Sequence, residues 1–161
     1  MSQINSNSTQ SNIHSELLDV VIVGGGLVGG LTALLLAQGG VQATVLDAAP
    51  ILDTEKTLAV ANPRVLALSQ ATIHLLKRVD VWNSLARQMP YTGMQVWNKN
   101  GYGEIKFGQE SENFPTAEQS LGSMVEPSVL NLAIQQKMLE LLTDYRTQVK
   151  VVRVEQGVGC W

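Results

Sequence analysis

Five glycines directly follow a run of branched apolar residues near the start of this 161-residue chain. The stretch DVVIVGGGLVGGLTALLLAQGG, residues 19–40, holds seven glycines, and Asp19 is its only charged residue. Glycine weakens helices and strands by about 0.5–1 kcal/mol relative to alanine, so a group this dense needs a local reason. The five are Gly24, Gly25, Gly26, Gly29 and Gly30. They predict a turn that joins a strand to a helix.

The residues on either side of these glycines predict a strand, a helix and a second strand. Asp19–Val23 contains four consecutive branched residues without polar alternation, which is typical of a strand buried on both faces of a parallel sheet. Leu27–Gln38 is predicted to be a helix, and Gly39 with Gly40 supplies its stop signal. With a second strand at Val41–Asp47, the unit has about thirty residues, the length of a right-handed βαβ crossover.

The spacing Gly24-x-Gly26-x-x-Gly29 is typical of a dinucleotide-binding turn. The first glycine allows a tight turn, the second lets the backbone approach a pyrophosphate, and the third lets helix and strand pack closely. Asp47 ends the second strand, where an acid would bind a ribose hydroxyl. The pattern predicts an adenine dinucleotide and leaves both NAD and FAD open. The alternative is a helix start whose glycines serve packing alone.

The rest of the chain is predicted to continue an α/β fold of Rossmann type, with a parallel sheet and a small β-hairpin insertion. The predicted strands are Arg64–Leu68, Leu121–Val125 and Val149–Val154, with a hairpin of Met94–Trp97 and Glu104–Phe107. The predicted helices are Ser69–Val79 with Ser69 as N-cap, a short piece at Val81–Gln88, and one beginning at Pro127. Ala48–Pro63 is predicted to be a loop.

The composition excludes several classes of function. A net charge of −3 provides no basic field for a polyphosphate backbone, so nucleic acid is not an expected partner. The single cysteine, Cys160, allows no internal disulfide, and His14 and His74 lie far apart in the sequence, so no metal site is predicted. The apolar run Leu17–Ala37 is long enough to raise the question of a membrane span. Asp19 and the glycines favour strand, turn and helix instead.

Residues 1–18, MSQINSNSTQSNIHSELL, are predicted to form a disordered polar tail. They contain neither Lys nor Arg and no apolar segment, which argues against a secretory signal and against an Arg-rich transit peptide. Residues 19–161 are predicted to form one partial dinucleotide-binding domain.

Three blocks of the sequence together resemble the FAD-dependent aromatic hydroxylases of ubiquinone biosynthesis, a group related to para-hydroxybenzoate hydroxylase. The first block is the βαβ unit, from Asp19 to Pro50. The second, PRVLALSQATIHLLKRVDVW at residues 63–82, is similar to the family's Arg-x-x-Ala-Leu segment and the helix after it. The third, LGSMVEPSVLNLAIQQKML at residues 121–139, is similar to a strand–helix passage that lines the flavin.

This resemblance implies an NAD(P)H-dependent flavoprotein monooxygenase. In such enzymes NAD(P)H reduces FAD, the reduced flavin reacts with O2, and one oxygen atom is transferred to an electron-rich phenolic ring. The implied substrate is a polyprenyl phenol or benzoquinol. The implied location is the cytoplasm, with peripheral association at the inner membrane face or in a biosynthetic complex. No catalytic residue and no oligomeric state are assigned.

The resemblance also implies which residues bind FAD. Asp47 stands where the family more often has a glutamate, and the ribose contact remains available to it. Arg64 matches a family arginine that contacts FAD, and its alternative is a solvated arginine. Asn131 lies near the position where the family often has a long polar residue that meets the flavin. The alternative interpretation of Asn131 is an exposed helix residue without a role in binding. The expected set is Gly24, Gly25, Gly26, Leu27, Val28, Gly29, Asp47, Ala48, Arg64 and Asn131.

Two passages of the family have no counterpart here: an Asp-Gly passage after the strand near residues 149–154, and a later Gly-Asp-Ala passage. The chain is therefore expected to be the N-terminal part of a longer enzyme. One alternative is a complete, non-catalytic dinucleotide-binding module, which would have to tolerate exposed sheet edges that promote aggregation. The other is a different FAD- or NAD-dependent oxidoreductase that shares the βαβ unit.

Overall fold

The computed structural model describes residues 18–99, 101–108 and 120–156, so the predicted tail at residues 1–18 lies almost entirely outside the described residues. The helices are α1 (Leu27–Gln38), α2 (Thr54–Ala59), α3 (Gln70–Arg78) and α4 (Pro127–Leu141), with a 3-10 turn, η1, at Trp82–Ser84. The strands are β1 (Val21–Val23), β2 (Thr44–Leu46), β3 (Leu66–Ser69), β4 (Met89–Tyr91), β5 (Gly93–Trp97), β6 (Glu104–Gly108), β7 (Gly122–Val125) and β8 (Tyr145–Arg146).

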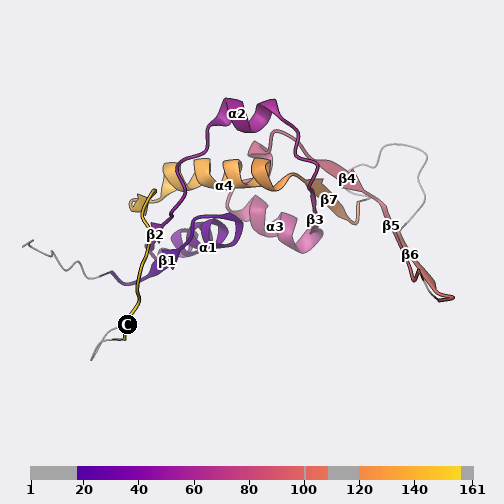
Figure 1. The fold of residues 1–161 in the computed structure, drawn as a ribbon, viewed down its shortest axis with the longest axis horizontal. Helices are drawn as coiled ribbons and strands as arrows, with labels where there is room; N and C mark the ends of the chain where they lie inside the picture. The colour runs from indigo at the N-terminus through magenta and orange to yellow at the C-terminus, as the bar shows by residue number, and fades with distance from the viewer. Residues whose placement is uncertain (1–17, 100, 109–119, 157–161) are drawn as a thin grey trace, which may run out of the picture.

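A parallel sheet of order β1-β2-β8 carries the glycine turn. Val21 pairs with Thr44, and Val45 pairs with Tyr145. Helix α1 leads from the end of β1 back to the start of β2, and it packs on both strands (Figure 1). The predicted βαβ unit is thus present, and the predicted α/β fold with a parallel sheet is confirmed.

A second sheet, of order β3-β7-β4, is antiparallel in both of its pairings. The predicted hairpin is confirmed as β5 and β6, which pair from Gly93 with Gly108 to Trp97 with Glu104. This hairpin extends away from the body of the molecule, and its residues are exposed throughout (Figure 1). The antiparallel pairing around β7 joins segments that are far apart in the sequence, and local periodicity does not predict it.

The core lies between α1 and α4, which run side by side in the centre of Figure 1. Ala33 and Leu34 of α1 and Ile134 and Met138 of α4 belong to one buried cluster, and each is at most 1% exposed. A Cβ built on Gly30 would lie 2.5 Å from Cγ2 of Ile134. Gly30 therefore has a packing role, because a larger residue would hold the two helices apart.

Helix ends that the sequence marks with capping residues are confirmed. Helix α1 has the predicted bounds, with Gly26 before it and Gly39 after it. Ser69 caps α3, because its hydroxyl accepts a hydrogen bond from the Thr72 N–H. Helix α4 begins at Pro127, where the missing N–H of proline costs no helical hydrogen bond.

Three predicted segments are wrong. Residues 48–63 are not a continuous loop, because α2 forms within them and Asp53 caps its first turn. Val81–Gln88 is helical only at η1, after which the chain extends into β4. Val149–Val154 is not a strand, since no strand of the described residues pairs with it, and Val152 is 87% exposed. The strand that does join β2 is β8, a few residues earlier.

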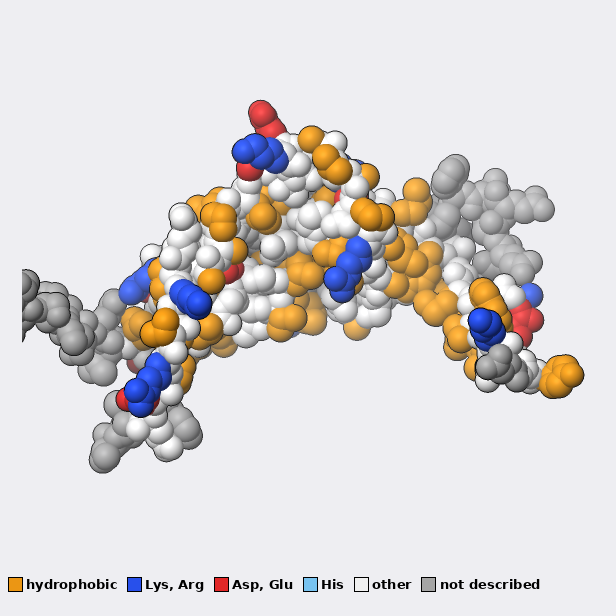
Figure 2. Space-filling model, in the orientation of Figure 1, with side chains coloured by type: hydrophobic (Ala, Val, Ile, Leu, Met, Phe, Trp, Pro, Cys, Tyr) orange, Lys and Arg blue, Asp and Glu red, His pale blue; other side chains and the backbone are white. Residues whose placement is uncertain are grey.

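Hydrophobic side chains reach the surface on the body and on the hairpin (Figure 2). Val23 of β1 and Val28 in the first turn of α1 are 62% and 82% exposed. Within the part of the chain that the structure describes, β1 pairs on one side only, with β2. No helix in that part is long and apolar enough to cross a membrane. The open edge of β1 and the exposed first turn of α1 both adjoin the glycine turn.

Candidate nucleotide-binding site

Hydrogen bonds from backbone N–H groups to the Asp47 carboxylate hold the glycine turn and Asp47 together. The Gly25 N–H donates to Oδ2 of Asp47 at 2.9 Å, and the Ala49 N–H donates to Oδ1 at 2.9 Å. The Gly24 N–H donates to the Leu46 carbonyl oxygen at 2.8 Å, which extends the pairing of β1 with β2 into the turn. The structure thus brings together the two parts of the dinucleotide pattern, the glycines and the acid.

The three fingerprint glycines have different steric environments. Gly24 has a φ of +101°, a backbone conformation that residues other than glycine rarely adopt. A Cβ on Gly29 would overlap the Gly24 carbonyl oxygen, so only glycine lets α1 start this close to the turn. A Cβ on Gly26, by contrast, would meet no atom within 4 Å. The fold itself requires Gly24 and Gly29, whereas Gly26 borders open space.

The first turn of α1, where Leu27 and Val28 lie, offers the features of an anion site. Gly26 is the N-cap residue, no side chain caps the helix, and its first turn carries no acidic residue. The first N–H groups of a helix have no partner within the helix, and the helix dipole places partial positive charge there. A phosphate group beside Gly26 would be stabilised by both effects.

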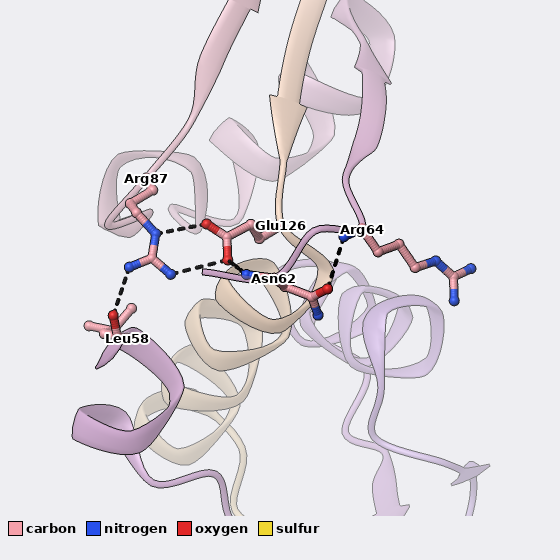
Figure 3. A network of polar contacts seen from close by, with 5 residues as sticks. All are labelled: Leu58, Asn62, Arg64, Arg87 and Glu126. Atoms are coloured by element: carbon pink, nitrogen blue, oxygen red, sulfur yellow. Dashed lines mark hydrogen bonds and ion pairs between the residues drawn. The ribbon is translucent and has the colours of Figure 1, made fainter. Parts of the chain in front are cut away.

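Arg64 lies just before β3 and is exposed. Its backbone N–H donates to Oδ1 of Asn62 at 3.0 Å. Its guanidinium extends away from the neighbouring polar network in Figure 3, and within the described ranges it has no hydrogen bond or ion pair. The structure therefore leaves this cation available and does not bring it into contact with the glycine turn.

Asn131 lies in the second turn of α4, and its side-chain oxygen is buried. Neither this oxygen nor the buried hydroxyl of Ser128 has a hydrogen-bond partner among the residues that the structure describes. A buried polar atom without a partner is uncommon in folded proteins and needs an explanation. A bound ligand would provide one. Ala48, the remaining member of the predicted set, is exposed directly after Asp47.

The sequence pattern does not point to a polar network at the start of α4, which is drawn in Figure 3. Glu126 and Arg87 form a two-point ion pair, with Nε 2.8 Å from Oε1 and Nη2 3.1 Å from Oε2. The Asn62 N–H donates to Oε2 of Glu126 at 2.7 Å, and Arg87 Nη1 donates to the Leu58 carbonyl oxygen at 2.8 Å. The network holds the segment between α2 and β3 against the start of α4. This segment leads to Arg64.

Acidic pH should weaken this network and destabilise the fold. The hydrogen bond from Arg87, and next the one from Asn62, lower the pKa of Glu126 below its ordinary value of 4.5. A carboxyl group with a lowered folded-state pKa stabilises the fold above its unfolded pKa, and this contribution is lost as the pH falls through the folded pKa. Urea unfolding should therefore show a steeper loss of stability below about pH 4.5 in the wild type than in Glu126→Gln. Glu104→Gln, on the exposed hairpin, should behave as the wild type, and equal pH dependence in wild type and Glu126→Gln would contradict the prediction.

A family model described as "FAD binding domain" matches residues 17–159. This chain belongs to the FAD binding domain family. As a member of that family it is 35% identical over 124 residues to 3-demethoxyubiquinol 3-hydroxylase of Escherichia coli (strain K12), an alignment that covers 74% of this chain and 30% of that enzyme. It is 32% identical over 149 residues to the mitochondrial ubiquinone biosynthesis monooxygenase COQ6 of Drosophila melanogaster, covering 88% of this chain and 31% of that protein. The resemblance to ubiquinone hydroxylases inferred from the sequence is confirmed.

Solved structures share the fold of this FAD binding domain. The p-nitrophenol 4-monooxygenase PnpA of Pseudomonas putida DLL-E4 matches with a TM-score of 0.60 and 23% identity, over 86% of this chain and 33% of that one. A variant of PqsL from P. aeruginosa matches with a TM-score of 0.60 and 18% identity, over 87% of this chain and 36% of that one. The chain spans roughly a third or less of the proteins it matches, such as 30% of the Escherichia coli relative.

Proposed function

We propose that this chain is the FAD-binding part of an NAD(P)H-dependent flavoprotein monooxygenase that hydroxylates a polyprenyl phenol or benzoquinol in ubiquinone biosynthesis. The observation that carries the proposal is the hydrogen bond from the Gly25 N–H to Asp47, which sets the acid beside the open start of α1. Membership of the FAD binding domain family supports FAD over NAD. The relatives named for ubiquinol hydroxylation and ubiquinone biosynthesis support the substrate class.

FAD fits the residues that are present. The space over Gly26 is open, and the first turn of α1 offers N–H groups to a pyrophosphate. Each Asp47 oxygen accepts one backbone N–H and keeps a lone pair for a ribose hydroxyl. Arg64 offers an uncommitted guanidinium, and the Asn131 oxygen an unused acceptor. In this proposal, FAD contacts Gly24, Gly25, Gly26, Leu27, Val28, Gly29, Asp47, Ala48, Arg64 and Asn131.

Bound FAD would supply the redox and oxygen-transfer chemistry, and the residues of this chain bind and orient its nucleotide half. NAD(P)H, O2 and the phenolic substrate are assigned in this proposal to the whole enzyme. A second candidate is a dinucleotide-binding module without catalytic activity. It is favoured by the short span of the match, 30% of the Escherichia coli relative. Hydroxylation assays distinguish the two.

Asp47→Ala should weaken FAD binding by about 1–3 kcal/mol, because it removes the ribose acceptor and leaves two backbone N–H groups without partners. That loss corresponds to an increase in Kd of roughly fivefold to 150-fold, measured by titrating FAD and following flavin fluorescence. Asp47→Glu, which installs the more usual family residue, should bind nearly as the wild type does.

Asp53→Ala is a matched control for this test. Asp53 also accepts a backbone N–H, at 3.0 Å from Lys56, but it does so at the start of α2 rather than at the glycine turn. The variant should lose some helix stability and keep its FAD affinity. A folded Asp47→Ala chain with unchanged FAD affinity would remove the ribose role of Asp47.

A further inference from the structure

Tyr145, in β8, lies against the glycine turn. A Cβ built on Gly25 would lie 3.0 Å from Cε2 of Tyr145 and 3.2 Å from its hydroxyl oxygen, and 2.8 Å from Oδ2 of Asp47. The Tyr145 hydroxyl and the Asp47 carboxylate therefore border the same small volume beside Gly25. This geometry also explains why residue 25 is a glycine, because any side chain at that position would collide with both groups.

Gln135 of α4 donates a hydrogen bond to the Tyr145 hydroxyl and so orients it. The Gln135 side chain is buried, with 4% of the residue exposed, and its oxygen accepts a hydrogen bond from the Leu52 N–H at 2.5 Å. Its Nε2 therefore faces Tyr145 and donates to the hydroxyl oxygen at 3.0 Å. A hydroxyl that accepts one hydrogen bond still has its own proton to donate. Within residues 18–99, 101–108 and 120–156, no acceptor takes this proton.

The Tyr145 hydroxyl stays protonated at neutral pH. Burial is the main cause that raises the pKa of Tyr145 above its ordinary value of 10.0, the hydrogen bond from Gln135 opposes it, and the charge of Asp47 raises it further. The hydroxyl can therefore donate a hydrogen bond, and the neighbouring Asp47 carboxylate can accept one. A ligand group that suits both must donate and accept at once.

We propose that the Tyr145 hydroxyl donates a hydrogen bond to a ribose hydroxyl of the bound adenine nucleotide, beside Asp47. A ribose hydroxyl can donate its proton to Asp47 and accept from Tyr145 at the same time. Gln135 is a positioning residue, because it acts by orienting Tyr145. This inference rests on the proposed function, since it needs an adenine nucleotide in the site.

The test is calorimetric titration of the wild-type chain and Tyr145→Phe with ADP, 2′-deoxy-ADP and 3′-deoxy-ADP. We expect Tyr145→Phe to bind ADP about five- to tenfold more weakly, the loss of one hydrogen bond. With the deoxy analogue that lacks the contacted hydroxyl, wild type and variant should bind alike. Tyr91→Phe, which alters a half-buried tyrosine in β4, should match the wild type with all three nucleotides.

Two results would overturn the inference and leave the proposed function standing. One is equal ADP affinity of the wild type and Tyr145→Phe. The other is an equal loss toward all three nucleotides, which would show that the hydroxyl acts on the fold or on another part of the nucleotide. A wild-type chain that binds neither ADP nor FAD would overturn the proposed function itself, and this inference with it.

Discussion

Replacing Gly26 with valine should abolish FAD binding and leave the chain folded. Gly26 has a φ of −72° and a ψ of −162°, an extended conformation that valine adopts readily, and a Cβ there would meet no atom within 4 Å. The added side chain would occupy the space at the start of α1 where we propose that the pyrophosphate lies. Circular dichroism checks the fold, and fluorescence titration with FAD measures the binding.

Gly29→Ala is the matched control, because this substitution should lower the stability of the fold. Its Cβ would overlap the Gly24 carbonyl oxygen, and relieving that overlap requires α1 to move away from the turn. We expect a loss of about 1–3 kcal/mol in the free energy of unfolding, as for other overpacked sites. A folded Gly26→Val chain that binds FAD with wild-type affinity would show that the glycines serve packing alone.

The second large effect concerns the 161-residue chain on its own, which should bind FAD weakly and show no phenol-stimulated oxidation of NAD(P)H. It matches 30% of the length of its Escherichia coli relative, so contacts from the rest of such an enzyme are not available to the flavin. Each missing hydrogen bond costs about 1 kcal/mol, and every 1.4 kcal/mol lowers affinity about tenfold. FAD should therefore dissociate during gel filtration.

A chimaera that adds the remaining segments of the Escherichia coli relative should restore both FAD retention and phenol-stimulated oxidation. A 161-residue chain that keeps stoichiometric FAD through gel filtration and oxidises NAD(P)H when a phenol is added would contradict the prediction. A chimaera that retains FAD but hydroxylates no phenol would instead favour the non-catalytic module.

Local sequence signals predict the βαβ unit, its glycine turn and most helix starts. Backbone geometry requires glycine at position 24 and close packing requires it at position 29, so the glycine spacing indicates the turn before any contact is known. Ser69 and Pro127 mark helix starts in the same way, because capping depends on residues within one turn of each other.

The remaining features depend on contacts between segments far apart in the sequence. Arg87 meets Glu126 across the start of α4, and no spacing rule links them. Tyr145 reaches Gly25 because β8 pairs with β2, in a register that periodicity does not specify. The same reason explains why the prediction of a strand at Val149–Val154, a valine-rich segment, is wrong: a strand needs a pairing partner as well as a suitable composition.

Parallel titrations of the wild-type chain with FAD and with NADH decide between the two cofactors that the glycine pattern allows. We expect a saturable change in flavin fluorescence with FAD that is absent in Gly26→Val and is not displaced by NADH at the same concentration. Saturable binding of NADH without any binding of FAD would contradict the assignment of this chain to a flavoprotein monooxygenase.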